Sequence, residues 1–277
     1  MRKLLLATLA LLLGITDMSA QTNSEIFNHL GTSIGVGTTG ITIDLSTPVT
    51  HYLGIRAGVD IIPTIKYSTD LNIEYPATVQ TARDVLSAHG INTDELPKNI
   101  EVEGKASLVT EHILLDIFPF KNSSFHFTTG IYIGGSKVIK VYNKKEGILS
   151  LANTYNDYVS QNPIVAKKYG LTPAGIQLGN YFLTPDNEGN VNAYIKTNKI
   201  RPYIGLGFGR SVPTEHHLAC QFDIGVQLLG TPKVYIQDDP DPLTEQDTEG
   251  KDGGLIKAIS KSNVYPCLSL RLVGRIL

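Results

Sequence analysis

Apolar and polar residues alternate one for one along much of the chain, which is the pattern of a β-strand with one apolar and one polar face. The clearest example runs from Leu53 to Ile61, where leucine, isoleucine, alanine and valine alternate with glycine, arginine and aspartate. The same alternation recurs in five further segments, namely 41–46, 125–134, 201–208, 217–228 and 268–276. Two less regular segments, 30–37 and 103–117, complete a prediction of eight strands.

The connections between these segments have two very different lengths. Long polar segments follow the third, fifth and seventh strands, at 68–99, 140–190 and 237–261. Short turns follow the second, fourth and sixth strands, at 47–50, 121–124 and 210–215. Membrane barrels have this asymmetry, with long extracellular loops and short periplasmic turns. The pattern predicts an all-β chain, an antiparallel up-and-down transmembrane β-barrel of about eight strands with long extracellular loops.

The long loops carry signs of local structure. Thr78 to His89 and Gly147 to Val159 have the composition of short helices. The turn-forming sequence at 185–190 predicts a hairpin over 181–198.

The first residues have the order of an export signal. Arg2 and Lys3 precede an apolar run that ends at Ile15, and small residues follow at 19–20. The run is about half the length that a helix needs to cross about 30 Å of hydrocarbon. No later segment reaches about 18 uninterrupted apolar residues, so the rest of the chain can enter a membrane only as a closed barrel. We expect a signal peptide at 1–20 and one barrel domain over 21–277.

Composition narrows the function further. The formal net charge is -2 and no segment is rich in lysine and arginine, so nothing indicates nucleic-acid binding. There are 26 Gly, 13 Tyr and no Trp. The chain has two cysteines, Cys220 and Cys267, in opposite phases of their strands. A disulfide scaffold is therefore excluded, and we expect these two thiols to remain unpaired.

The polar faces of the strands combine glycine with charges of both signs. The charged residues are Asp44, Arg56, Asp60, Arg201, Asp223, Arg271 and Arg275. The interior of an eight-stranded barrel has room only for side chains, and charges persist there only when they are paired. The pattern predicts a structural charge network in the lumen, with Asp223 facing Arg271 and Arg56 facing Asp44. The alternative is a soluble, lipocalin-like barrel with these charges on its solvated surface, which the absence of tryptophan favours.

With these segments in view, the chain resembles outer-membrane β-barrel proteins of Gram-negative bacteria, most of them functionally uncharacterised. The similarity lies in residues 35–40 (GVGTTG), 118–120 (FPF) leading into 123–126 (SSFH), 185–190 (PDNEGN), 201–207 (RPYIGLG) and 222–226 (FDIGV). It spans nearly all of the chain after the leader. The resemblance implies a cell outer membrane location, contact with outer-membrane lipid and insertion by the barrel-assembly machinery. It supplies no catalytic residues.

Three motifs suggest chemistry but are better explained otherwise. Residues 35–40 match a dinucleotide-binding fingerprint, yet a strand rather than a helix follows them, so we expect a tight hairpin. His216 and His217 have no further ligand at metal-binding spacing. The segment 238–252 holds seven carboxylates without EF-hand spacing, which indicates an acidic surface loop, with calcium binding as the alternative. The sequence therefore predicts no catalytic residue, metal site or cofactor.

The preferred function is a structural or surface-interaction barrel that is not an enzyme and whose outer loops contact an extracellular partner. Two alternatives remain. A soluble periplasmic or secreted barrel would carry an apolar ligand in its interior. An outer-membrane protease or acyltransferase would need acid and base groups that converge at the rim of the barrel, and the sequence shows no such set.

Overall fold

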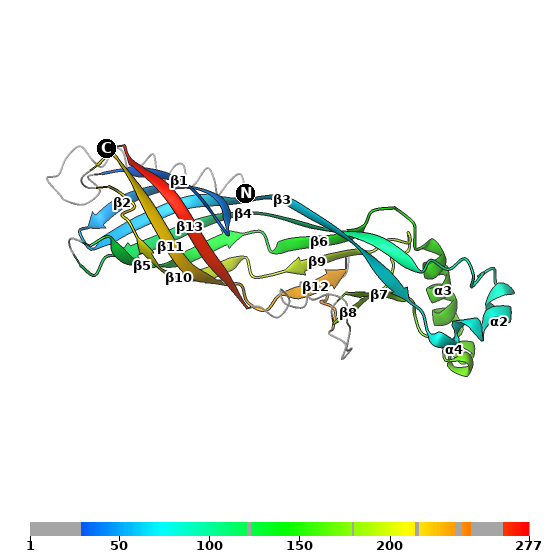
Figure 1. Cartoon of the computed structure of the whole chain (residues 1–277). Helices are drawn as coiled ribbons and strands as arrows, with labels where there is room; N and C mark the ends of the chain where they lie inside the picture. The colour runs from blue at the N-terminus through cyan, green and yellow to red at the C-terminus, as the bar shows by residue number, and fades with distance from the viewer. Residues whose placement is uncertain are drawn as a thin grey trace.

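Eight antiparallel strands close into a barrel in the computed structural model, which describes residues 29–120, 123–178, 180–213, 216–236, 240–244 and 263–276 (Figure 1). The barrel strands are β1 (Gly31–Gly37), β2 (Gly40–Thr50), β3 (Leu53–Glu74), β4 (Asn99–Ile117), β5 (Phe125–Gly134), β10 (Ile200–Phe208), β11 (Leu218–Leu228) and β13 (Val264–Arg275). Each pairs with the next, and β13 pairs with β1 to close the ring. The prediction of an eight-stranded up-and-down barrel is confirmed.

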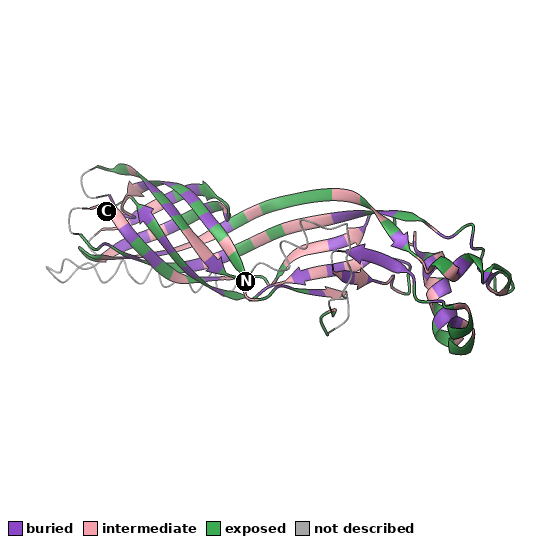
Figure 2. Cartoon of the chain, turned by 60° about the horizontal axis from the view of Figure 1, so that its bottom comes forward, coloured by how far each residue is buried: buried purple, intermediate pink, exposed green. Residues whose placement is uncertain are grey.

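The alternating residues of the barrel strands face opposite sides of its wall. On β2, Ile41 and Ile43 point outward and are 45% and 52% exposed, whereas Thr42 and Asp44 point inward and are 0% and 1% exposed. Figure 2 shows the same alternation of buried and exposed residues along the neighbouring strands. The apolar face is therefore on the outside of the barrel and the polar face on the inside.

The glycine-rich segment 35–40 forms the turn between β1 and β2. Gly37 lies opposite Gly40, and Thr38 and Thr39 form the loop. Gly40 has a φ of 96°, and a Cβ there would lie 2.2 Å from the carbonyl oxygen of Ile61. Only glycine fits this position, so the segment is the expected hairpin rather than a dinucleotide-binding loop.

Strands β3 and β4 continue well beyond the barrel and remain paired as far as Asn72 and Asn99. Past the barrel, β4 pairs with β6 (Lys137–Asn143), β6 with β9 (Asn192–Lys196), and β9 with β12 (Lys233–Ile236). The far end of β3 pairs with β7 (Gly175–Leu178), which pairs with β8 (Tyr181–Leu183). These strands, with the helices between them, form what we call the extension (Figure 1).

The extension has its own apolar cores. One lies between its strands and includes Ile100, Val141, Ile176 and Ile195. The second joins the helices η2 (Ala77–Gln80), α2 (Arg83–Ser87), α3 (Ser150–Gln161) and α4 (Pro163–Tyr169) at the end far from the barrel. None of the helices in the described part of the chain is long and apolar enough to span a membrane.

The long connections are thus more ordered than the sequence predicted. Short helices occur within both segments of helical composition, but the expected hairpin over 181–198 is wrong. The turn forms, with Asp186 accepting hydrogen bonds from the backbone of Glu188 and Asn190, yet β8 pairs with β7 and β9 pairs with β6 and β12. Leu183 of β8 and Ile195 of β9 are both buried in the same core. Burial in this core, rather than closeness along the chain, therefore determines which strands β8 and β9 pair with. The leader at 1–20 and most of 238–252 lie outside the described residues.

The two cysteines are free and lie on opposite faces of the barrel wall, as predicted. Cys220 is exposed on the outer face opposite Leu272, whereas Cys267 lies opposite Gly225 and is 5% exposed. An apolar maleimide should therefore label one thiol per chain in the detergent-solubilised native protein and both thiols after denaturation, as counted by mass spectrometry. Native Cys220→Ser should remain unlabelled. Rapid labelling of Cys267 in the native protein would contradict this placement.

Candidate functional site

Five of the seven charged residues predicted for the lumen lie together inside the barrel. They are Asp44, Arg56, Asp60, Asp223 and Arg271, and each is at most 2% exposed. They project inward from β2, β3, β11 and β13, so the network joins strands from different parts of the ring. Alternation places these residues inward, and their position inside the barrel buries them from water.

Asp223 on β11 is the centre of the network. Its carboxylate forms an ion pair with the Arg271 guanidinium, accepts a hydrogen bond of 3.2 Å from Nη2 of Arg56, and lies 2.9 Å from Nε2 of His126. The same Nη2 of Arg56 donates to Asp116 Oδ1 at 2.8 Å. One carboxylate thus has two guanidinium groups as neighbours, and one of these also binds a second carboxylate.

A second part of the network is centred on His112 of β4. Its Nδ1 lies 2.6 Å from Asp60 Oδ2, and its Nε2 lies 2.9 Å from Asp44 Oδ1. The hydroxyl of Thr42 donates to Asp60. Arg271 joins the two parts because its Nε lies 3.0 Å from Asp44 while its Nη1 contacts Asp223. Four carboxylates therefore face two guanidinium groups and two imidazoles within the described residues.

The predicted pair of Arg56 and Asp44 is wrong, although that of Asp223 and Arg271 is present. Asp44 lies opposite Gly58 and Arg56 opposite Ser46, so the two charges are offset along the barrel. Arg56 instead reaches across the lumen to Asp223 and to Asp116. In a narrow barrel the nearest opposite charge can lie on a distant strand.

The other two predicted residues lie apart from the network. Arg201 is buried, but it donates to the carbonyl oxygens of Asn198 and Gly135, at 2.9 Å and 2.7 Å, where β5 and β10 leave the barrel. Arg275 is half-buried at the other end and donates to the carbonyl of Pro213. Alternation identified the face that these residues share but not their height along the barrel.

Among the network residues that sequence reasoning missed are His112, Asp116, His126 and Thr128. All four were detectable because they alternate with apolar residues on β4 and β5. On β4 the pattern was obscured by Glu111, which occupies the outward phase opposite Ile133 near the end of β5. Even on an irregular strand, the polar residues that alternate with apolar ones can therefore be predicted to face the lumen.

The ligand atoms of Asp116, His126 and Asp223 lie close enough together to hold a metal ion. However, Nη2 of Arg56 donates to both of these carboxylates, and Arg271 binds Asp223 from another side. A guanidinium group already supplies the positive charge that a metal would bring. The arrangement is that of an ion-pair network.

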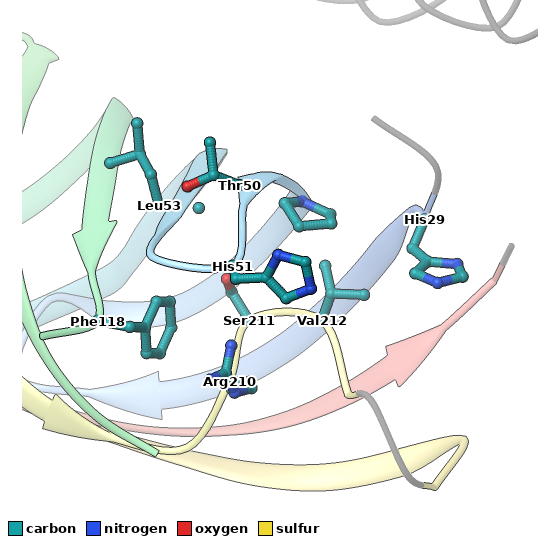
Figure 3. Close-up of a pocket in the computed structure, with 10 residues that line it drawn as sticks. His29, Thr50, His51, Leu53, Phe118, Arg210, Ser211 and Val212 are labelled. Atoms are coloured by element: carbon teal, nitrogen blue, oxygen red, sulfur yellow. The ribbon is translucent and has the colours of Figure 1, made fainter. Parts of the chain in front are cut away.

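A small cavity opens at the end of the barrel that carries the short turns (Figure 3). Its volume is about 230 Å³, below the ~300–1,000 Å³ typical of small-molecule sites. In this cavity Arg210 lies 4.6 Å from the centroid of the Phe118 ring. The Phe118 ring also contacts His126 of the network, and the two ring centroids are 5.2 Å apart. Phe118 thus separates the cavity from the charged interior.

Replacing Asp223 with asparagine should strongly destabilise the barrel, because Arg56 and Arg271 would be left buried with one fewer carboxylate. Removing one partner of a buried pair costs about 3–5 kcal/mol. Urea unfolding in lipid vesicles measures this difference. Asp84→Asn, on the exposed surface of α2, is the control and should change the free energy of unfolding by less than about 0.5 kcal/mol. A similar small effect for Asp223→Asn would contradict the network.

No protein-family model matches the chain, and no curated protein matches it. Among solved structures the chain is similar to Acinetobacter baumannii CarO2, with 17% identity, a TM-score of 0.45, and coverage of 91% of this chain and 100% of that chain. It is also similar to Acinetobacter baumannii CarO, with 15% identity, a TM-score of 0.42, and coverage of 88% and 96%. With TM-scores this low, neither likeness contributes to the functional interpretation, which rests on the residues described above.

Proposed function

We propose that this chain is an outer-membrane β-barrel protein whose lumen is closed by ion pairs and whose extension serves a structural or surface-interaction role. The observation that carries the proposal is the inverted polarity of the barrel. Its interior holds charged side chains that are almost completely buried, and its exterior is apolar.

The apolar exterior runs right round the barrel. All eight strands contribute exposed apolar side chains, among them Ile34, Ile43, Ile61, Ile113, Phe127, Ile204, Phe222 and Leu270. Soluble proteins rarely expose a contiguous apolar patch of more than a few hundred Å². Lipid removes this cost, and an apolar outer band around a polar interior is the pattern of outer-membrane barrels. A soluble barrel that carries an apolar ligand would need the reverse, because its interior must be apolar.

The network favours a plugged barrel over a conduit. Arg56 and Arg201 are among the largest fully buried side chains of the described residues, and an eight-stranded barrel has space for little more than its own side chains. The acid and base groups of the network are also bound to one another and buried from substrates. We therefore infer a non-catalytic role.

The extension is the part that can meet a partner. It lies at the end of the barrel that carries the long connections (Figure 1). Because β3 and β4 continue as paired strands from the barrel into the extension, the extension is joined to the barrel by a sheet rather than through a linker. Binding surfaces are commonly carried in this way by segments mounted on a rigid scaffold.

Cell fractionation followed by proteolysis tests the proposed location and orientation. The chain should sediment with outer membranes, and trypsin added to intact cells should cleave the extension after Lys144 or Lys168. Cleavage after Arg210, in the turn between β10 and β11, should require permeabilised cells. Recovery in the soluble periplasm would overturn the membrane assignment, and cleavage at Arg210 alone in intact cells would reverse the orientation.

A further inference from the structure

One face of the sheet in the extension is covered by lysines and tyrosines. They lie on β3, β4, β6, β9 and β12 and are Lys66, Lys105, Lys137, Lys140, Lys196, Lys233, Tyr142, Tyr194 and Tyr235. We call this surface the lysine–tyrosine face. The other side of the same strands packs into the apolar core through Val141, Ala193, Ile195 and Val234. The face is therefore one side of a well-supported sheet.

Lysines lie directly opposite one another across this face. Lys105 pairs in register with both Lys66 and Lys140, and Lys196 with both Lys137 and Lys233. Like charges at such positions destabilise an antiparallel sheet. Their repetition across five strands indicates a surface that is suited to negative charge from elsewhere.

The same side of β3 and β4 also carries Asp70, Glu101 and Glu103. Among the described residues only Glu103 forms an ion pair with a lysine of the face, whereas Glu101 pairs with Lys144 at 2.6 Å. Glu103 forms an ion pair of 2.9 Å with Lys66 and accepts a hydrogen bond from the Tyr142 hydroxyl. These two contacts lower the pKa of Glu103, the hydrogen bond from Tyr142 contributing most, so this carboxylate is charged and already bound. In this part of the chain the other five lysines form no ion pair.

The tyrosines place flat rings between the charges. The Lys137 amine lies 3.9 Å from the centroid of the Tyr194 ring, and the Lys196 amine lies 3.6 Å from that of Tyr235. Cation–π contacts of this kind orient the amines without neutralising them. A ligand that combines phosphate groups with sugar rings would find both an ammonium partner and a flat apolar surface here.

The position of the face identifies the source of such a ligand. On β4, Lys105 has the same phase as the outward-facing Val109, Ile113 and Leu115. It lies four residues beyond Val109, or about 13 Å along the strand. The lysines therefore begin just past the apolar band, on the side of the wall that faces the lipid, where the headgroups of the outer leaflet would lie.

We propose that the lysine–tyrosine face binds the phosphorylated sugar headgroup of a glycolipid in the outer leaflet and so holds the extension against the membrane surface. This inference rests on the proposed outer-membrane location. Lysine ammonium groups bind the phosphates as point charges, and the tyrosine rings lie against the sugar.

Native mass spectrometry of the full chain in neutral detergent tests this binding. The probes are a bisphosphorylated disaccharide glycolipid, its fully dephosphorylated form and phosphatidylglycerol. Lys105→Gln/Lys140→Gln/Lys233→Gln should bind the bisphosphorylated glycolipid at least about tenfold more weakly than the wild type. Lys98→Gln/Lys167→Gln/Lys168→Gln removes the same charge away from the face and should bind as the wild type does.

Thermal melting separates a loss of binding from a loss of folding. Without lipid, the triple variant Lys105→Gln/Lys140→Gln/Lys233→Gln should melt no lower than the wild type, because it removes lysines that lie opposite other lysines. The bisphosphorylated glycolipid should raise the Tm of the wild type and the control but not of this variant. Equal binding by the variant, equal binding of the dephosphorylated form, or equal binding of phosphatidylglycerol would each overturn the assignment. The detergent measurement is independent of fractionation, so it can fail while the membrane location holds.

Discussion

Charged side chains inside the barrel are almost completely buried, and this constraint sets the rest of the architecture. Separating such charges from water is costly, and only close opposite charges and hydrogen bonds can offset the cost. Asp223 meets this condition through Arg56, Arg271 and His126, which come from three other strands. A slip of one residue in any of these strands would turn its charge to the apolar outside of the barrel. The network therefore favours one register around the ring.

The polarity that suits the barrel is the opposite of the one that suits the extension. Apolar residues face outward on the barrel, but in the extension they must face inward to form its core. β3 makes this change with a bulge between Ile62 and Ile65. Before it, Val59 faces outward and Asp60 inward; after it, Ile73 faces the core and Lys66 faces out. The bulge thus inverts the strand without breaking it.

Strand existence was predictable wherever the alternation was regular along a whole segment, and six of the eight barrel strands meet that condition. The other two, β1 and β4, alternate less regularly, and on β4 Glu111 occupies the outward phase. The extension was not predictable in the same way. β7, β8 and β12 have only four, three and four residues, too few to show a period. Their partners are also remote, since β12 pairs with β9 and β7 with the end of β3. Burial of their apolar residues in a common core determines those pairings, and the sequence around each strand does not indicate its partner.

In the candidate site, too, the sequence predicts which side of the strand a residue faces better than it predicts which residue it contacts. Phase alone indicated that Asp223 and Arg271 share the lumen, and consecutive strands made their contact predictable. Arg56 has its partners on β4 and β11, at a height that depends on the stagger of the strands. That stagger follows from the closure of the whole ring, so no pair of neighbouring segments determines it. The same closure fills the lumen with the side chains of the strands themselves, so the stagger of the whole ring decides which charges meet.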